Sequence, residues 1–268
     1  MAAELRIIAD VARFRLARLE MANLVAAVAI MLALHLPGPE LVARTLFGVL
    51  LNLLVYLNND WFDLEDDLAS STRDQDKTEF LAAHRPAGMR AQLGLLGLLA
   101  GFALVWGGGL MWVLLVGAGV CAAYSKLLKR RPFVDVVAMM VWGAAMPAVG
   151  VPPGDAVGWL LLGQLALFSG VFETIQVLRD REGDARISVR TTAVVLGAGP
   201  TAALARVLML VSAVYAALLF HPLVAVGPMM AAVMPVPSKD LTRYWHRVRF
   251  LLGPTLVAEC ALIYLGRV

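Results

Sequence analysis

Nine apolar stretches recur along this chain of 268 residues, and no other feature restricts its fold as strongly. A helix needs about 20 mostly apolar residues to cross the hydrocarbon core of a bilayer. Within lipid, only helices and closed barrels satisfy every backbone polar group. We therefore expect an all-α fold, a polytopic membrane bundle of nine transmembrane helices. The predicted spans cover residues 19–37, 41–58, 91–107, 109–125, 133–150, 157–178, 201–220, 222–236 and 250–266.

The overall composition supports a membrane protein with one domain. Hydrophobic residues make up 60% of the chain and charged residues 16%, whereas soluble domains are nearer half apolar and a quarter charged. No linker or low-complexity segment divides the chain, so we expect a single integral membrane domain over residues 1–268. The two cysteines, Cys121 and Cys260, lie in apolar runs and are expected to be buried thiols rather than a disulfide or a metal pair. We read the first apolar run as a span, not as a removed signal peptide.

The basic residues orient this predicted bundle. With nine spans, five basic clusters fall on the same side, and the positive-inside bias makes that side cytoplasmic. The opposite side carries only Arg44 and Arg267, so topology accounts for the net charge of +3 and no nucleic-acid partner is needed. The clusters are Arg6, Arg13, Arg15 and Arg18; Arg73, Lys77, Arg85 and Arg90; Lys126, Lys129, Arg130 and Arg131; Arg179, Arg181, Arg186 and Arg190; and Lys239, Arg243, Arg247 and Arg249.

The stretch "NNDWFDLEDD" places five acidic residues directly after the second apolar run. If the helix continues through it, Asp60, Asp63 and Asp67 lie at i, i+3 and i+7 and share one face. Like charges this close repel one another, so the face favours a cation. Oxygen ligands of this kind suit Mg²⁺, which uses one or two carboxylates together with phosphate oxygens and water. Asn59 adjoins the same face and adds an amide oxygen.

A second acidic motif, "RDREGD", ends the sixth apolar run on the same predicted side of the membrane. Asp180 and Asp184 lie at i and i+4, again on one helix face. Glu173 precedes them on the same helix, and Asn52 and Tyr56 form a polar stripe before the first motif. Ionisable residues within membrane segments are costly and usually functional. The sequence therefore predicts two carboxylate faces at one membrane depth.

Basic residues at the same level complete the prediction of a metal–polyphosphate site. Carboxylates would hold Mg²⁺, while lysine and arginine would neutralise the remaining phosphate charge. The chain has neither a P-loop nor a His-Glu-x-x-His zinc motif, and its four histidines are scattered. The basic candidates are Arg73, Lys77, Arg85, Lys126, Lys129 and Arg130.

With both motifs identified, the chain resembles the UbiA superfamily of intramembrane prenyltransferases. The resemblance follows nearly the whole chain in order, and the pairing of the two acidic motifs on a nine-span protein makes it specific. The first span lacks the Arg-Pro that opens many relatives, and "RPAGMR" lacks their Leu-Pro-Ser. The matching segments are "NDWFDLEDD" at 59–67, "HRPAG" at 84–88, "YSKLLKRRP" at 124–132, "DREGD" at 180–184 and "RISVRTTAVVLG" at 186–197.

The resemblance implies a central cavity that opens near the cytoplasmic side, a prenyl diphosphate substrate and Mg²⁺ as cofactor. It leaves open whether Lys126 or Lys129 contacts the diphosphate, because the spacing from Tyr124 differs by one residue among relatives. The implied metal ligands are Asn59, Asp60, Asp63, Asp67, Asp180 and Asp184. The candidate catalytic residues are Asp60, Asp63, Asp180, Glu173 and Tyr124, and the candidate substrate-binding residues are Asn52, Tyr56, Lys77, Arg85, Lys126, Lys129 and Arg130.

The expected reaction is Mg²⁺-dependent transfer of a prenyl group to an aromatic or lipid-like acceptor, through diphosphate ionisation and an allylic carbocation. A membrane terpene cyclase would use the same ionisation without an acceptor and remains the nearest alternative. A transporter fits less well, because the acids cluster on one membrane face and no inverted repeat is evident. We expect a multi-pass protein of the bacterial inner membrane whose active site faces the cytoplasm. The sequence does not indicate the donor length, the acceptor or the oligomeric state.

Overall fold

The computed structural model describes residues 1–17, 21–68 and 75–268, and every element of regular structure in these ranges is a helix. Arg18 and Arg73, which belong to the predicted basic clusters, lie outside the described residues. The α-helices are α1 (Ala2–Ala17), α2 (Ala22–Ala33), α3 (Gly38–Phe62), α4 (Leu64–Leu68), α5 (Gln75–Ala83), α6 (Arg85–Trp106), α7 (Leu110–Lys126), α8 (Val134–Ala145), α9 (Ala156–Arg186), α10 (Thr192–Leu196), α11 (Ala198–Leu219), α12 (Val226–Val233) and α13 (Leu241–Tyr264). The short 3₁₀ helices are η1 (Leu128–Arg130), η2 (Pro147–Gly150) and η3 (Pro222–Ala225).

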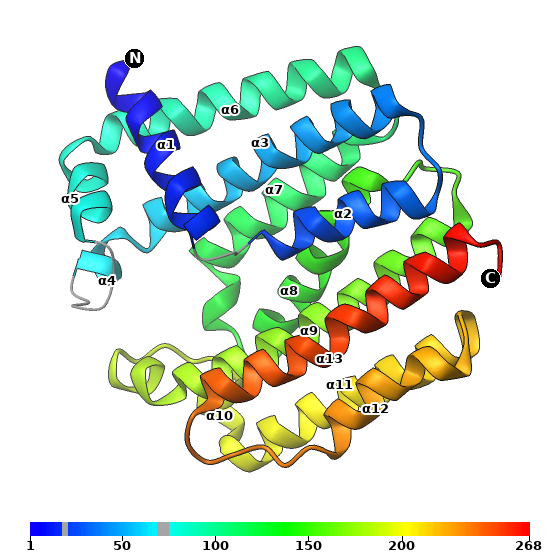
Figure 1. The fold of residues 1–268 in the computed structure, drawn as a ribbon. Helices are drawn as coiled ribbons and strands as arrows, with labels where there is room; N and C mark the ends of the chain where they lie inside the picture. The colour runs from blue at the N-terminus through cyan, green and yellow to red at the C-terminus, as the bar shows by residue number, and fades with distance from the viewer. Residues whose placement is uncertain (18–20, 69–74) are drawn as a thin grey trace.

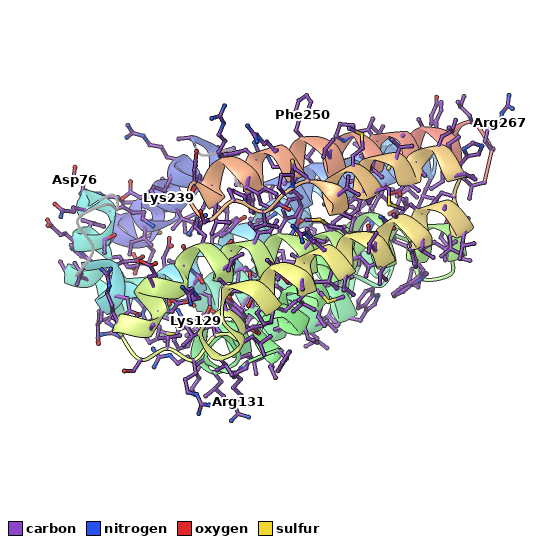
Figure 2. All side chains as sticks on the ribbon, turned by 90° about the horizontal axis from the view of Figure 1, so that it is seen from below. Asp76, Lys129, Arg131, Lys239, Phe250 and Arg267 are labelled. Carbon is purple, nitrogen blue, oxygen red and sulfur yellow. The ribbon has the colours of Figure 1, made fainter. Side chains whose placement is uncertain are left out.

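The long helices run along a common direction, and the short helices α4, α5 and α10 lie toward one end of the bundle (Figure 1). In the first half of the chain α3 packs against α2, α6 and α7, and in the second half α9 packs against α8, α11 and α13. Contacts of α7 with α8 and of α2 with α13 join the two halves. We call the end that holds α4, α5 and α10 the motif end. Figure 2 shows Asp76, Lys129 and Lys239 toward this end and Arg267 at the other.

The surface of the bundle is apolar where a soluble protein would be polar. On α6, small and aliphatic side chains such as Ala91, Leu95 and Leu99 recur every fourth residue and face the core. On its outer side Leu104 is 75% exposed and Val105 is 89% exposed. Contiguous exposed apolar area of this kind suits contact with lipid chains.

Four helices in the described ranges, α3, α6, α9 and α11, are long and apolar enough to cross a membrane. Helices α1 and α2 meet the same criterion only as a pair whose axes differ by 77°. The predicted spans at 109–125, 133–150 and 222–236 correspond to shorter apolar helices, and the run at 250–266 lies in α13. The prediction of helices at all nine positions is confirmed, but nine full-length spans are not.

Three consecutive glycines form the turn between α6 and α7. Gly107, Gly108 and Gly109 all adopt positive φ angles, of 71°, 58° and 81°. This left-handed conformation is costly for residues with a Cβ atom, which explains why three glycines reverse the chain there.

Arg44, one of the two basic residues assigned to the side opposite the basic clusters, is buried inside the bundle. It donates to the carbonyl oxygens of Val149 at 2.9 Å and Gly108 at 3.0 Å. Its Nε atom also pairs with Glu40 at 2.6 Å. Arg44 therefore joins α3, η2 and the α6–α7 turn, because a buried guanidinium needs several acceptors to offset its lost hydration.

Candidate active site

The first acidic motif lies where α3 ends at the motif end of the bundle. The predicted continuous helix is interrupted, since α3 stops at Phe62 and Asp63 is its C-terminal cap. Nevertheless, the Asp63 amide donates to the Asn59 carbonyl at 2.9 Å, and the Asp67 amide donates to the Asp63 carbonyl at 2.8 Å. These bonds to the fourth preceding residue keep a helical spacing across the break.

Asp60 is held inside the protein by two cations. Its Oδ1 atom accepts from Arg15 Nη2 at 2.6 Å, and its Oδ2 atom accepts from Lys77 Nζ at 2.7 Å. The Asp60 side chain is only 3% exposed. The three partners come from α1, α3 and α5, so Asp60 ties these helices together. Both carboxylate oxygens of Asp60 are thus engaged by cations in this structure.

Arg15 is a site residue that the sequence reading used only for topology. Its guanidinium lies 4.4 Å from the centre of the Tyr56 ring, which places the predicted polar residue Tyr56 beneath a cation. Asn52, one turn earlier, is buried and donates to the Gly48 carbonyl of its own helix at 3.3 Å. No local sequence motif marks Arg15, because its partner is 45 residues away along the chain.

Lys129 links the first acidic motif to the rest of the site. It lies in η1 and forms an ion pair with Asp63, and Ser125 on α7 donates to the Asn59 side chain at 3.4 Å. Lys129 also lies within electrostatic reach of Asp184 in the second motif. Lys129 therefore contacts the first motif and interacts electrostatically with the second.

The other predicted bases lie farther out. Lys126 and Arg130 are exposed. Arg85 begins α6, is 45% exposed and stands 3.6 Å from Glu65. Its guanidinium lies 4.9 Å from the Trp61 ring centre. Of the two lysines between which the sequence could not choose, the geometry favours Lys129.

The second acidic motif lies on the last turns of α9, which has 31 residues. At 1.5 Å per residue such a helix is about 46 Å long, which exceeds a hydrocarbon core of about 30 Å. Part of α9 therefore extends beyond the core. Asp180 accepts from the neighbouring Arg179 at 2.7 and 2.8 Å and is 44% exposed, while Asp184 accepts from the Thr191 hydroxyl at 3.3 Å.

Tyr124 and Glu173 form a polar pair one level deeper in the bundle. The Tyr124 hydroxyl donates to Glu173 Oε1 at 2.7 Å, and Glu173 is 5% exposed. The pair joins α7 to α9, so two predicted catalytic residues that are far apart in the sequence do meet in the structure.

The donor set of the two motifs fits Mg²⁺ better than a softer metal. Within the described ranges no three histidine, cysteine or acidic side chains converge closely enough to form a complete metal cage. Mg²⁺ does not need one, since it is usually bound by one or two carboxylates together with substrate phosphates and water. Asp63 and Asp67 of the first motif and Asp180 and Asp184 of the second carry oxygen atoms of the kind that Mg²⁺ binds.

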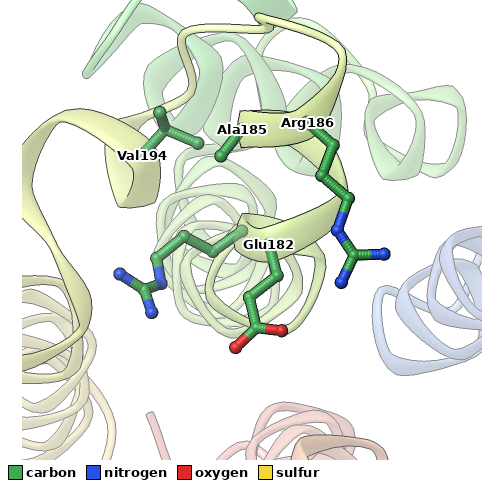
Figure 3. A pocket seen from close by; sticks show the side chains of 5 residues that line it. Glu182, Ala185, Arg186 and Val194 are labelled. Carbon is green, nitrogen blue, oxygen red and sulfur yellow. The ribbon is translucent and has the colours of Figure 1, made fainter.

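Two pockets elsewhere on the bundle do not include these carboxylates. One, of about 310 Å³, is lined by Arg181, Glu182, Ala185, Arg186 and Val194 and is drawn in Figure 3. It occupies the side of α9 opposite to Asp180 and Asp184, as helical spacing requires. The other, of about 460 Å³, is an apolar hollow between α7, α8 and α9, beside the stacked rings of Trp112 and Trp159.

Comparison with solved structures shows which fold this is. The structure is similar to a UbiA homologue from Archaeoglobus fulgidus bound to GPP and Mg²⁺, with a TM-score of 0.73, 12% identity and coverage of 98% of this chain and 99% of that chain. The same archaeal homologue bound to DMAPP and Mg²⁺ gives a TM-score of 0.68 and 14% identity, covering 97% of this chain and 99% of that chain. A digeranylgeranylglyceryl phosphate synthase gives a TM-score of 0.72 and 13% identity, covering 98% of this chain and 99% of that chain.

A comparison with family models identifies the family from the sequence. No curated protein matches the chain at the sequence level. The model of the UbiA prenyltransferase family matches residues 22–250, which include both acidic motifs, Lys129 and the Tyr124–Glu173 pair. Together with the apolar helices, this match makes the chain an integral membrane protein. The chain belongs to the UbiA prenyltransferase family.

Proposed function

We propose that this protein transfers a prenyl group from a prenyl diphosphate to a hydrophobic or aromatic acceptor within the membrane. One observation carries the proposal: Lys129 pairs with Asp63 of the first acidic motif and lies within electrostatic reach of Asp184 of the second. Two oxygen-rich motifs around a shared ammonium group suit a metal-bound diphosphate. The archaeal homologue of similar fold was bound to GPP or DMAPP together with Mg²⁺, which supports the same substrate class here.

The proposed topology has nine crossings with the motif end in the cytoplasm. The crossings are α1 with α2, then α3, α6, α7, α8 with η2, α9, α11, η3 with α12, and α13. The described members of the five basic clusters would then lie on the cytoplasmic side, as the positive-inside bias requires. The cell would be bacterial and the membrane its inner membrane. The catalytic cavity would open at this end, between α3, α7 and α9.

Residues of both acidic motifs and three basic residues would bind the diphosphate leaving group. When bound, Mg²⁺ would be held by Asn59, Asp63, Asp67, Asp180 and Asp184, and it would neutralise the diphosphate as negative charge develops on it. The Lys129 ammonium donates to the diphosphate oxygens. Asp60 keeps Arg15 and Lys77 directed at the same site, so that their positions are set before the substrate arrives.

The bond between the prenyl C1 atom and the diphosphate oxygen then breaks, and the electron pair leaves with the diphosphate. The allylic cation forms among apolar side chains, where little water can quench it. The acceptor attacks C1 and loses a proton. We propose that Glu173 accepts this proton. The Tyr124 hydroxyl orients the Glu173 carboxylate, and Glu173 is buried, with 5% exposure. Tyr56 and Asn52 remain candidates to orient the acceptor.

The test uses purified protein in lipid nanodiscs, a panel of prenyl diphosphates that begins with GPP and DMAPP, and a panel of acceptors. Asp63→Asn and Asp184→Asn should each lower diphosphate release by roughly 10²–10³-fold, the usual cost of losing a group that stabilises developing charge. Removal of Mg²⁺ with EDTA should have the same effect on the wild type.

The matched controls are Asp66→Asn and Glu182→Gln, which remove one exposed charge each from the same two segments. Both should keep activity near that of the wild type. Wild-type turnover by Asp63→Asn would contradict the proposed site. A hydrocarbon or terpene alcohol formed from the diphosphate alone would identify a cyclase instead.

A further inference from the structure

Asp135 is a fully buried carboxylate that the sequence reading did not single out. It lies in the first turn of α8, has 0% exposure and accepts three hydrogen bonds. The donors are the Thr192 amide at 2.7 Å, the Val136 amide at 2.9 Å and the Thr192 hydroxyl. A buried carboxylate is costly unless hydrogen bonds replace its hydration, so this arrangement has to be maintained by the fold.

Thr192 closes a small ring of hydrogen bonds with the segment before α8. Its Oγ1 atom accepts from the Phe133 amide at 2.6 Å while its hydroxyl donates to Asp135. Phe133 adopts a φ of 66°, a left-handed conformation that is unfavourable for an aromatic residue. Such strain persists only where surrounding contacts impose it, and it often marks a functional region. We call Phe133, Asp135 and Thr192 the latch.

The latch lies between the two halves of the diphosphate site. On one side the chain leads back from Phe133 through η1 to Lys129, which pairs with Asp63. On the other side Thr191, next to Thr192, donates to Asp184 at 3.3 Å. The bonds between Asp135 and Thr192 connect segments that are 57 residues apart in the sequence. The bond from the Phe133 amide to Thr192 joins the same two segments, the chain between η1 and α8 and the chain that follows the second motif.

We propose that the latch is a positioning device that sets the separation between Lys129 and Asp184. This inference rests on the proposed function, because it assigns the two groups to one diphosphate. Asp135 does not touch the substrate. It acts through Lys129 on one side and Thr191 on the other, so its loss should weaken binding of the diphosphate more than it slows the chemical step.

The experiment compares Thr192→Val, which removes the hydroxyl, with Thr192→Ser, which restores it. Inorganic pyrophosphate with Mg²⁺ serves as the binding probe, measured by calorimetry on full-length protein in nanodiscs. Thr192→Val should raise its Kd, and the KM for the prenyl diphosphate, by about tenfold, the equivalent of one charge-assisted hydrogen bond. Its kcat should change far less, and Thr192→Ser should bind nearly as the wild type does.

Thr201→Val is the matched control for a loss of stability alone. Thr201 is also fully buried, and its hydroxyl donates to the Gly197 carbonyl of its own segment at 2.7 Å. This variant should lower the unfolding temperature without changing the Kd for pyrophosphate. Asp135→Asn provides a second break of the latch and should raise the Kd in the same direction.

The outcomes separate this inference from the proposed function. If the wild type binds pyrophosphate and Thr192→Val binds it equally well, the latch has no positioning role. An equal rise in Kd for Thr192→Val and Thr201→Val also contradicts it, since general loosening would then explain both. If the wild type itself does not bind pyrophosphate with Mg²⁺, the proposed function fails and the inference fails with it.

Discussion

The two acidic motifs differ in how their charges are balanced. In the first, Asp60 and Asp63 are paired with Arg15, Lys77 and Lys129, which come from three other elements of the chain. In the second, Asp180 pairs with the adjacent Arg179 and is 44% exposed. The first motif is thus assembled by tertiary contacts, whereas one long helix presents the second. We infer that the first motif contributes to stability as well as to binding and that the second contributes mainly to binding.

The largest expected effect is on stability and comes from Asp60→Asn. Removing this carboxylate takes a buried negative charge away from Arg15 and Lys77, which typically costs about 3–5 kcal/mol. Denaturant unfolding in detergent micelles should show the loss. Asp66→Asn, at an exposed position in the same segment, should stay within about 0.5 kcal/mol of the wild type. Equal stabilities for the two variants would remove the distinction between the motifs.

The second largest effect is expected for Lys129, which interacts with both motifs. Lys129→Met removes the ammonium group and keeps a long apolar side chain. We expect the KM for the prenyl diphosphate to rise by roughly 10–100-fold, as for one or two lost charge-assisted hydrogen bonds. Lys126→Met, at the exposed lysine, should leave the KM near that of the wild type. The reverse result would assign the diphosphate contact to Lys126.

The smallest expected effect is that of Arg179→Gln on the second motif. Exposed ion pairs contribute about 0–1 kcal/mol, and salt screens them. The variant should therefore unfold within a few degrees of the wild type, and high salt should shrink the difference further. A loss of stability as large as that of Asp60→Asn would show that the second motif is also anchored by its ion pair.

The local features of this protein could be predicted from its sequence. Apolar runs predicted the helices because burial in lipid or core depends on the side chains of one segment at a time. Both acidic motifs, the glycine turn at 107–109 and the buried state of Cys121 and Cys260 follow from short stretches of sequence. The family resemblance rested on the same short motifs, and the family model confirmed it.

Local patterns did not indicate how long each span is. The runs at 109–125 and 133–150 form shorter helices, and α3 stops at Phe62 although its pattern continues. Helix ends depend on caps and on neighbouring elements, which a hydropathy pattern does not contain. The same limit explains why the sequence did not indicate that Arg44 lies buried between carbonyl groups.

By itself, the sequence determined the helical membrane fold, the oxygen-rich donor set and the family, because each depends on residue type and short spacing. Only the tertiary structure decided which charges meet. Arg15 forms an ion pair with Asp60, which is 45 residues away in the sequence. Lys129, and not Lys126, pairs with Asp63. Asp135 accepts a hydrogen bond from Thr192, which is 57 residues away. Such pairs form because a buried charge must find a partner in space, and helix packing, not order along the chain, determines which partners are near.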